Sequence, residues 1–195
     1  MLVKRLKKYN IILGSASPRR KKLLSELGLK FKIKKTQKKE SYPCNIKTSQ
    51  IAEFLAKQKS KYLSKDISKN DLLITVDTIV SHKGKILHKP KTKSEAIKTL
   101  ESLSGKTHKV ITGVCLRSIS KSVSFSSITE VSFNKLTQHE ILHYIEEFKP
   151  YDKAGSYGIQ EWIGYIGIKK INGSYNNVVG LPTSELYQEL ILFGK

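Results

Sequence analysis

The sequence predicts an α/β fold, and three observations support this. Apolar segments of strand length alternate along the chain with longer segments whose apolar residues recur at helical spacing. Residues 72–76 form a nearly continuous apolar run, which is typical of a strand buried on both faces. Residues 92–95 and 137–140 each have the pattern of a capping box at a helix start. At 195 residues the chain can form one sizeable core or two modest lobes that share a cleft, and we expect a single domain over residues 1–195.

The first half of the chain is expected to hold three strands and two helices. Ser17 can cap the first helix, and Pro18 fits its first position, where a missing N–H costs nothing. Apolar residues on one side of the second helix mark its buried face. The expected elements are strands at 10–13, 31–34 and 71–80, helices at 18–28 and 48–63, and a polar loop at 36–47.

The second half is expected to begin with a hairpin turn at 82–85 and to continue with helices that start at the two capping boxes. The strand at 123–133 is more polar than the one at 109–117, which places it closer to an edge of the sheet. Residues 152–160 are rich in small side chains and predict a structured loop or short helix. The remaining expectations are a helix that closes near Gly105, a helix whose buried stripe is Ile141, Leu142, Ile145 and Phe148, a strand region at 162–171, a turn at 172–173 and a helix at 183–193.

The charge balance is strongly positive, with 36 Lys and Arg against 16 Asp and Glu and a formal net charge of +20. The lysines are spread through every segment, and no zinc-finger, homeodomain or RNA-recognition pattern accompanies them. A solvated basic surface is therefore favoured over a specific nucleic-acid face. The chain has no apolar run of membrane-spanning length and no signal-peptide pattern, and its two cysteines lack metal-ligand spacing. We expect a soluble cytoplasmic protein with free thiols and no membrane partner.

The turn between the first strand and the first helix has the design of an anion site. Ser15 and Ser17 supply hydroxyls, Arg19 and Arg20 supply forked donors, and the helix start supplies backbone N–H groups. Phosphate is the first ligand that this combination suggests. An ordinary strand-to-helix connection with solvated arginines explains the segment equally well on its own.

Asp77 follows a buried strand, where open α/β sheets present ligand-binding residues. It is a candidate general base or metal ligand, although an aspartate that caps the next turn fits equally well. Lys59, Thr78 and Lys89 would suit a triphosphate in combination, while each lysine alone is more simply a surface residue. Glu40, in the polar loop, has the weakest claim to a role.

Gln160 ends the segment of small residues at 152–160, whose glycines permit close approach to a ligand. Its carboxamide offers a donor beside an acceptor, which matches the O4 and N3–H edge of uracil or thymine. A structural glutamine bonded to the backbone is the alternative. The histidines show no metal-binding spacing, and neither a nucleophile-elbow serine nor a cysteine beside a base is present in the sequence.

These segments together resemble the Maf family of nucleoside triphosphate pyrophosphatases over almost the whole chain. The 152–160 segment is similar to the branch that acts on dTTP and UTP rather than the branch that acts on 7-methyl-GTP. The sequence departs from the family pattern at Gly14, Ser60 and Val76, each at a position where alanine is common. The matching segments are 15–20, 55–56 with Lys59, 77–80, 89–90, 103–105 with His108, 112–113, 152–160, 171–175 and 179–182.

The resemblance implies a mixed twisted sheet with flanking helices, two lobes around a central cleft, and a homodimer. It implies a hydrolase that cleaves the α–β phosphoanhydride bond, with Asp77 as proton acceptor and with Mg²⁺ or Mn²⁺ held by Asp77 and Glu40. Arg19, Thr78 and Gln160 would mark substrate specificity. An aspartate of ordinary pKa, about 3.9, is a weak base toward free water, which is why a metal is expected. The alternative function is a non-catalytic nucleotide-binding regulator of cell division and septum formation.

Overall fold

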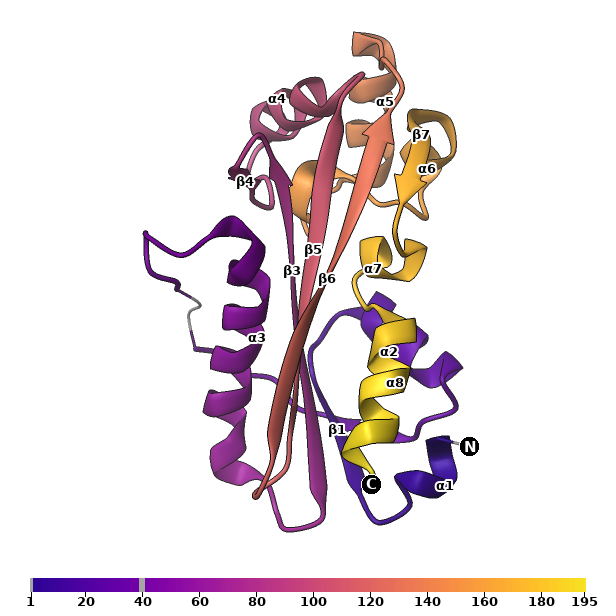
Figure 1. The fold of residues 1–195 in the computed structure, drawn as a ribbon. Coiled ribbons are helices and arrows are strands. Elements are labelled where there is room, and N and C mark those ends of the chain that lie inside the picture. The colour runs from indigo at the N-terminus through magenta and orange to yellow at the C-terminus, as the bar shows by residue number, and fades with distance from the viewer. Residues whose placement is uncertain (1, 39–40) are drawn as a thin grey trace. The chain divides into compact units, whose positions relative to one another are not determined.

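A mixed seven-stranded sheet with flanking helices organises the chain in a computed structural model that describes residues 2–38 and 41–195 (Figure 1). The strand order is β2-β1-β3-β5-β6-β7, and β4 pairs with β3 off this path. Strand β1 is parallel to both β2 and β3, whereas β4 is antiparallel to β3 and β7 to β6. The α/β prediction and the mixed sheet are confirmed. The strands are β1 (Asn10–Gly14), β2 (Phe31–Ile33), β3 (Asp71–His82), β4 (Lys85–Leu87), β5 (Thr107–Arg117), β6 (Ser122–Phe133) and β7 (Ile168–Asn172).

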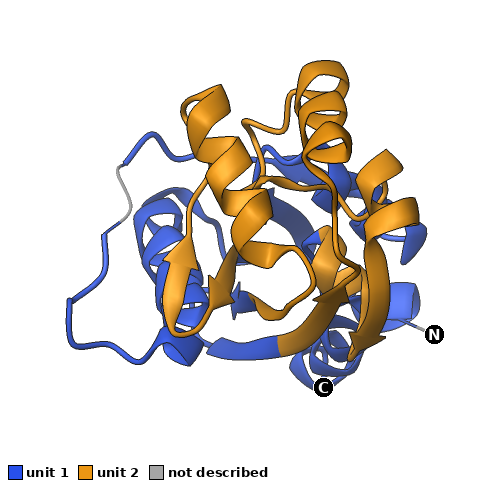
Figure 2. Ribbon diagram, turned by 90° about the horizontal axis from the view of Figure 1, so that it is seen from above, with its two compact units in different colours: residues 1–77, 112–127, 180–195 blue, residues 78–111, 128–179 orange. Residues whose placement is uncertain are grey.

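The described chain divides into two compact units, which Figure 2 distinguishes by colour. Unit 1 comprises residues 1–77, 112–127 and 180–195, and unit 2 comprises residues 78–111 and 128–179. Strands β3, β5 and β6 each contribute residues to both units. The division agrees with the two lobes that the family resemblance implies, and the single domain over residues 1–195 stays a prediction.

In unit 1, helices cover both faces of the sheet. Leu72, Ile74 and Val76 of β3 belong to one core cluster with residues of α1 (Leu2–Arg5), α2 (Pro18–Glu26) and α8 (Thr183–Phe193). Leu73 lies on the other face with Ile12 and with Leu63 of α3 (Thr48–Leu63), which a short 3-10 helix, η1 (Ser64–Asp66), follows. Successive strand residues point to opposite faces, so the continuous apolar run fills two cores at once, as predicted.

The helix caps agree with the sequence in most details. Ser17 caps α2 by accepting a hydrogen bond from Arg20 N, and Thr137 and Glu140 form the complete capping box of α5 (Gln138–Phe148). Thr92 caps α4 (Lys93–Leu103), but the Glu95 carboxylate accepts from the backbone of Lys91 rather than from Thr92. The fourth helix therefore has the cap without the expected reciprocal bond. No helix in the described residues is long and apolar enough to cross a membrane.

The prediction of a strand at 162–171 is wrong for the first part of that range. Residues Trp162–Gly167 form helix α6, and β7 begins only at Ile168. Gly164 N donates to Glu161 O at 2.8 Å, and a Cβ on Gly164 would lie 2.0 Å from Ile159 O, so the backbone folds back on itself here. This close packing overrides the β preference of the local residues. The remaining helices are short: α1, η2 (Ala154–Ser156) and α7 (Tyr175–Val179). The sequence predicted a structured segment where η2 lies, but it did not predict α1 or α7.

The buried stripe of α5 differs from the prediction at one end. Phe148 is 37% exposed, and Tyr144 is fully buried instead, stacked on Phe148 with ring centroids 5.2 Å apart. Burying tyrosine requires partners for its hydroxyl. Tyr144 has them in Glu161 and the backbone of Gly158, so its position in the core depends on residues 17 and 14 positions later in the chain.

Candidate active site

Asp77 is paired with Lys59 at the end of unit 1's part of β3. Lys59 Nζ lies 2.6 Å from Asp77 Oδ1 and donates to the Val76 carbonyl at 3.3 Å. Each of the two charged side chains is only 12% exposed. A largely buried carboxylate is costly unless a charge compensates it, and Lys59 supplies that charge.

Two contacts fix helix α3, which carries Lys59, against the sheet. Thr75 Oγ1 donates to the Ala56 carbonyl at 2.7 Å, three residues before Lys59. Gly113 of β5 lies directly under the helix, because a Cβ there would come within 2.2 Å of Glu53 N. Glycine at position 113 therefore allows the close backbone contact that fixes how near α3 lies to the sheet. That distance in turn decides how far the Lys59 side chain extends toward β3.

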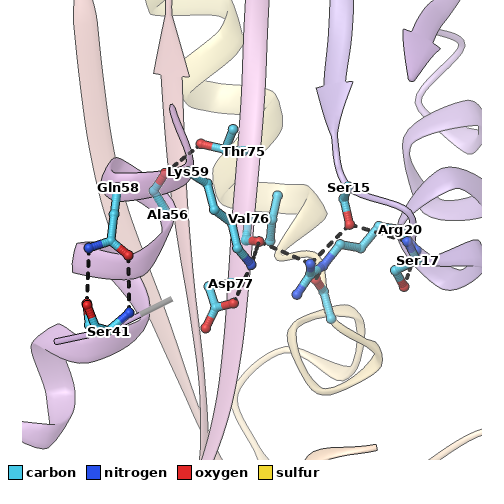
Figure 3. A network of polar contacts seen from close by, with 11 residues as sticks. Ser15, Ser17, Arg20, Ser41, Ala56, Gln58, Lys59, Thr75, Val76 and Asp77 are labelled. Carbon is cyan, nitrogen blue, oxygen red and sulfur yellow. Dashed lines mark hydrogen bonds and ion pairs between the residues drawn. The ribbon is translucent and has the colours of Figure 1, made fainter. Parts of the chain in front are cut away.

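Arg20 joins the strand-to-helix turn to the same place on β3 (Figure 3). Its Nη1 donates to the Val76 carbonyl at 3.0 Å and to Ser15 Oγ at 3.1 Å, and its Nε donates to the Gly180 carbonyl at 2.9 Å. Ser15 Oγ also accepts from Ser17 N at 3.3 Å. The serine hydroxyls and two of the guanidinium nitrogens are thus engaged with the protein itself, which fixes the shape of the turn.

The Val76 carbonyl is the point where the two cations meet. Lys59 reaches it from α3 and Arg20 reaches it from α2, and Asp77 is the next residue along β3. One carboxylate lies beside two cations, so this set of three side chains carries a net positive charge. Such an arrangement attracts polyanionic ligands and keeps a carboxylate close to where they would bind.

The other predicted site residues differ in where they lie in the chain and in how exposed they are. Arg19 is the second residue of α2 and is partly exposed. Thr78 is partly buried in β3, Lys89 is exposed after β4, and Gln160 is exposed in the 152–160 segment; all three belong to unit 2. Glu40 lies outside the described residues. The structure therefore assembles Ser15, Ser17, Arg20, Lys59 and Asp77 in one network of unit 1 and describes Thr78, Lys89 and Gln160 within the other unit.

The contacts of the two residues of α3 that flank Lys59 were not predicted from the sequence. The Gln58 carboxamide pairs with the backbone of Ser41 through both its oxygen, at 3.3 Å, and its nitrogen, at 3.1 Å (Figure 3). Ser60, a departure from the family pattern, accepts a 2.7 Å hydrogen bond from Arg117 Nε. Neither partner is close in sequence, so no local pattern could have shown these contacts.

The described residues contain no group of three or more His, Cys, Asp or Glu side chains arranged to hold a metal ion. Asp77 is the one carboxylate in the network of Figure 3. Mg²⁺ is commonly held by one or two carboxylates together with substrate phosphates and water. A single aspartate beside Lys59 and Arg20 is consistent with that mode of binding.

Fold and network together define an α/β protein with a carboxylate and two cations beside a strand-to-helix turn, an arrangement suited to phosphate chemistry. The chain belongs to the Maf family, because the family model described as "Maf-like protein" matches residues 10–193. Relatives named dTTP/UTP pyrophosphatase align with nearly the full chain. That of Phocaeicola vulgatus is 49% identical over 97% of this chain and 98% of its own length, and that of Flavobacterium johnsoniae is 45% identical over the same shares. That of Christiangramia forsetii is 49% identical over 97% of each chain.

Proposed function

We propose that this protein is a nucleoside triphosphate pyrophosphatase that hydrolyses dTTP and UTP to the nucleoside monophosphate and pyrophosphate. The observation that carries the proposal is the Lys59–Asp77 pair, with Asp77 Oδ1 2.6 Å from Lys59 Nζ and with Arg20 on the adjacent carbonyl. A module that only bound nucleotides would not need a carboxylate beside a triphosphate, because the like charges repel. The names of relatives at 45–49% identity support the two pyrimidine nucleotides as substrates.

The reaction requires a base, a positioned water and neutralisation of phosphate charge. Asp77 takes a proton from water while the water oxygen forms a bond to the α-phosphorus. The bond between the α-phosphorus and the α–β bridging oxygen breaks, and pyrophosphate leaves with that electron pair. Lys59 lies beside the carboxylate and lowers the repulsion between it and the incoming phosphates.

The remaining candidate residues divide between phosphate binding and base recognition. Arg19 and Lys89 bring further positive charge to the phosphates, and the turn shaped by Ser15, Ser17 and Arg20 holds the start of α2 near them. Thr78 and Gln160 are assigned to the specific recognition of the nucleotide. In this assignment the Gln160 carboxamide donates to O4 of uracil or thymine and accepts from N3–H.

A divalent cation, Mg²⁺ or Mn²⁺, completes the proposed site, with Asp77 as a ligand and Glu40 as a second candidate. When bound, it would neutralise phosphate charge and increase the acidity of the attacking water. Asp77 would hold the cation and accept the proton, and the greater acidity of the water would compensate for the weakness of the carboxylate as a base.

The test is an assay of the purified protein against a panel of nucleoside triphosphates with Mg²⁺, with Mn²⁺ and with excess chelator. Pyrophosphate and monophosphate are measured separately from orthophosphate. The expected result is pyrophosphate from dTTP and UTP and no turnover with chelator. Orthophosphate with a diphosphate product would mean cleavage at the terminal phosphorus and would refute the proposal.

Asp77→Asn tests the assigned base. We expect turnover to fall by about 10²–10⁴-fold, the usual contribution of a positioned base, while nucleotide binding measured by calorimetry persists. Asp66→Asn is the matched control, because Asp66 is 64% exposed and pairs with Lys34 at the surface. Turnover by Asp77→Asn at the wild-type rate would show that another group accepts the proton.

The proposal also includes a cytoplasmic homodimer. Its mass in solution, measured by light scattering after size-exclusion chromatography, tests the dimer directly, and a monomer over the working concentration range contradicts it.

A further inference from the structure

The positive charge of the chain is concentrated in unit 1. Unit 1 has 23 Lys and Arg against 8 Asp and Glu, a formal charge of +15, whereas unit 2 has 13 against 8, or +5. The strongest imbalance lies in residues 2–38, which contain 13 Lys and Arg and a single acidic residue, Glu26. Lysines occur in every segment of the chain, but the acidic residues that balance them elsewhere are nearly missing here. The distribution therefore points to a local property of one surface rather than to overall composition.

Residues 2–38 form one edge of the sheet in unit 1. Strand β2 is the terminal strand of the sheet and pairs with β1. A Cβ on Gly28, in the turn before β2, would lie 3.7 Å from Val3 Cγ2, so α1 packs beside this turn. After β2, Lys34 Nζ lies 3.0 Å from Asp66 Oδ2, which joins the end of the strand to η1 and to the C-terminal end of α3. The basic residues of α1, β2 and α3 therefore share one continuous surface.

The side chains that give this surface its charge are exposed. Lys38 extends the surface along α3, because its Nζ lies over the Tyr62 ring, 4.7 Å from the ring centroid. We call the surface the basic band and define it by six exposed lysines: Lys4, Lys30, Lys32, Lys35, Lys38 and Lys61. Like charges gathered on one surface repel one another and destabilise the compact state. A polyanionic ligand relieves that repulsion when it binds.

Protection of the sheet edge explains only part of the basic band. Lysine on an edge strand prevents pairing with strands of other molecules, which accounts for Lys32 within β2. Lys4 lies on α1 and Lys61 lies on α3, where no strand edge needs protection. Attraction of an anionic partner accounts for the lysines on the helices as well as for those on the strand.

The make-up of the basic band fits a nucleic acid better than a protein or a membrane. Protein interfaces have an apolar core in which lysine is depleted. In residues 2–38 the exposed large hydrophobic side chains are Val3 and Ile33, at 53% and 44%. A helix that lies on a membrane surface needs a long apolar face, whereas α1 has four residues. Interfaces with nucleic acids are polar and strongly positive, as this surface is.

We propose that the basic band binds the phosphate backbone of nucleic acids without reading their base sequence. The ammonium group of lysine binds phosphate as a point charge, and the release of counterions from the backbone drives such contacts. Lys38 already lies over the Tyr62 ring, so the contact is made with phosphates rather than with bases stacked on that ring. The inference concerns lysines outside the candidate active site and does not depend on the proposed function.

The first measurement is the affinity of the purified wild type for a short fluorescent DNA duplex, by anisotropy, at salt concentrations from about 0.05 to about 0.2 M. We expect a Kd of about 10⁻⁴–10⁻⁶ M near physiological salt, with no dependence on base sequence. The logarithm of the association constant should fall with the logarithm of salt concentration with a slope of about −5, since each neutralised phosphate contributes about −0.9. No binding at the lowest salt overturns the proposal.

The second measurement compares two variants that lose four positive charges each. The band variant carries Lys4→Gln, Lys30→Gln, Lys32→Gln and Lys35→Gln. The control variant replaces four exposed lysines of unit 2 and carries Lys98→Gln, Lys106→Gln, Lys169→Gln and Lys170→Gln. At about 0.1 M salt the Debye length is about 10 Å, so only charges close to the DNA affect its binding. We expect affinity to fall at least about tenfold in the band variant and less than about threefold in the control.

Arginine at the four band positions keeps the charge and should keep the affinity within about threefold of wild type. Surface substitutions of this kind change stability little, and thermal unfolding of every variant verifies that it is folded. Equal losses in the two glutamine variants would show a diffuse effect of net charge and overturn the band as a site. Tighter binding to polyglutamate or to phosphatidylserine vesicles than to DNA would overturn the choice of nucleic acid. A wild type that binds DNA through the band but releases no pyrophosphate from UTP supports this inference and refutes the proposed function alone.

Discussion

Acidification is expected to destabilise the protein through His108, a buried histidine of unit 2. His108 is 2% exposed and packs edge-to-face against Phe133 and Tyr157, with ring centroids 5.2 and 5.3 Å away. Its Nδ1 is buried with no hydrogen-bond partner among the described residues. Burial, together with the nearby charge of His82, lowers the pKa of His108 from 6.5 to about 4.

The direction in which pH changes the free energy of unfolding follows from how many protons the folded and the unfolded chain bind. In the unfolded chain His108 takes up a proton near its ordinary pKa, whereas in the folded chain it does so only near pH 4. Between these values the unfolded state binds more protons, so the free energy of unfolding falls as the pH falls. The full loss is about 3 kcal/mol, from the difference between the two pKa values at 1.36 kcal/mol per unit.

Urea unfolding measures this directly, with wild type and His108→Gln compared at several values from about pH 7 to about pH 5. The wild type should lose about 2 kcal/mol over this range, since most of the titration window lies within it. His108→Gln keeps a polar group near the Tyr157 hydroxyl and should be less stable at neutral pH but nearly independent of pH. The other histidines are the same in both proteins. Parallel pH dependence in the two proteins would show that His108 is not the source.

Two further substitutions test how α3 holds the candidate site. Gly113→Ala places a Cβ 2.2 Å from the α3 backbone and should lower the free energy of unfolding by about 3 kcal/mol, which corresponds to about 6–12 °C in Tm by calorimetry. Gly194→Ala is the control, because its Cβ would have no contact below 3.3 Å and Tm should change little. Lys59→Met leaves Asp77 largely buried without its partner, so it should cost about 3 kcal/mol in urea unfolding and lower kcat/KM for UTP. Lys57→Met, at a pair where lysine is 52% exposed, should cost less than about 1 kcal/mol. Equal effects at positions 57 and 59 would contradict the site geometry.

Long periodic elements could be predicted from the sequence to within a residue or two. Helices Thr48–Leu63 and Thr183–Phe193 have the expected bounds, and β3 extends two residues beyond the expected end. Each is long enough for its apolar spacing to dominate any single unfavourable residue. Both faces of β3 could be assigned to the core because a continuous apolar run has no polar side to expose.

Helix α7 could not be predicted, because distant contacts stabilise it. Helix Tyr175–Val179 contains the buried Asn177, whose Nδ2 donates to the Val110 carbonyl at 3.2 Å and to Thr129 Oγ1 at 2.8 Å. These partners lie 67 and 48 residues away. A five-residue helix has too few internal hydrogen bonds to form by local preference alone. Its existence therefore depends on the folded unit around it.

For the candidate site too, the sequence indicated the residue types but not the orientation of their side chains. The motif identified both arginines of the turn, but it could not show which one turns inward. Adjacent helical residues point about 100° apart, so a pair of arginines in the sequence does not show which side chain contacts the strand. Arg20 makes that contact and is tied to Val76, Ser15 and Gly180, the last of which is 160 residues away in sequence. Arg20 therefore shapes the turn, a role that the sequence motif alone did not show.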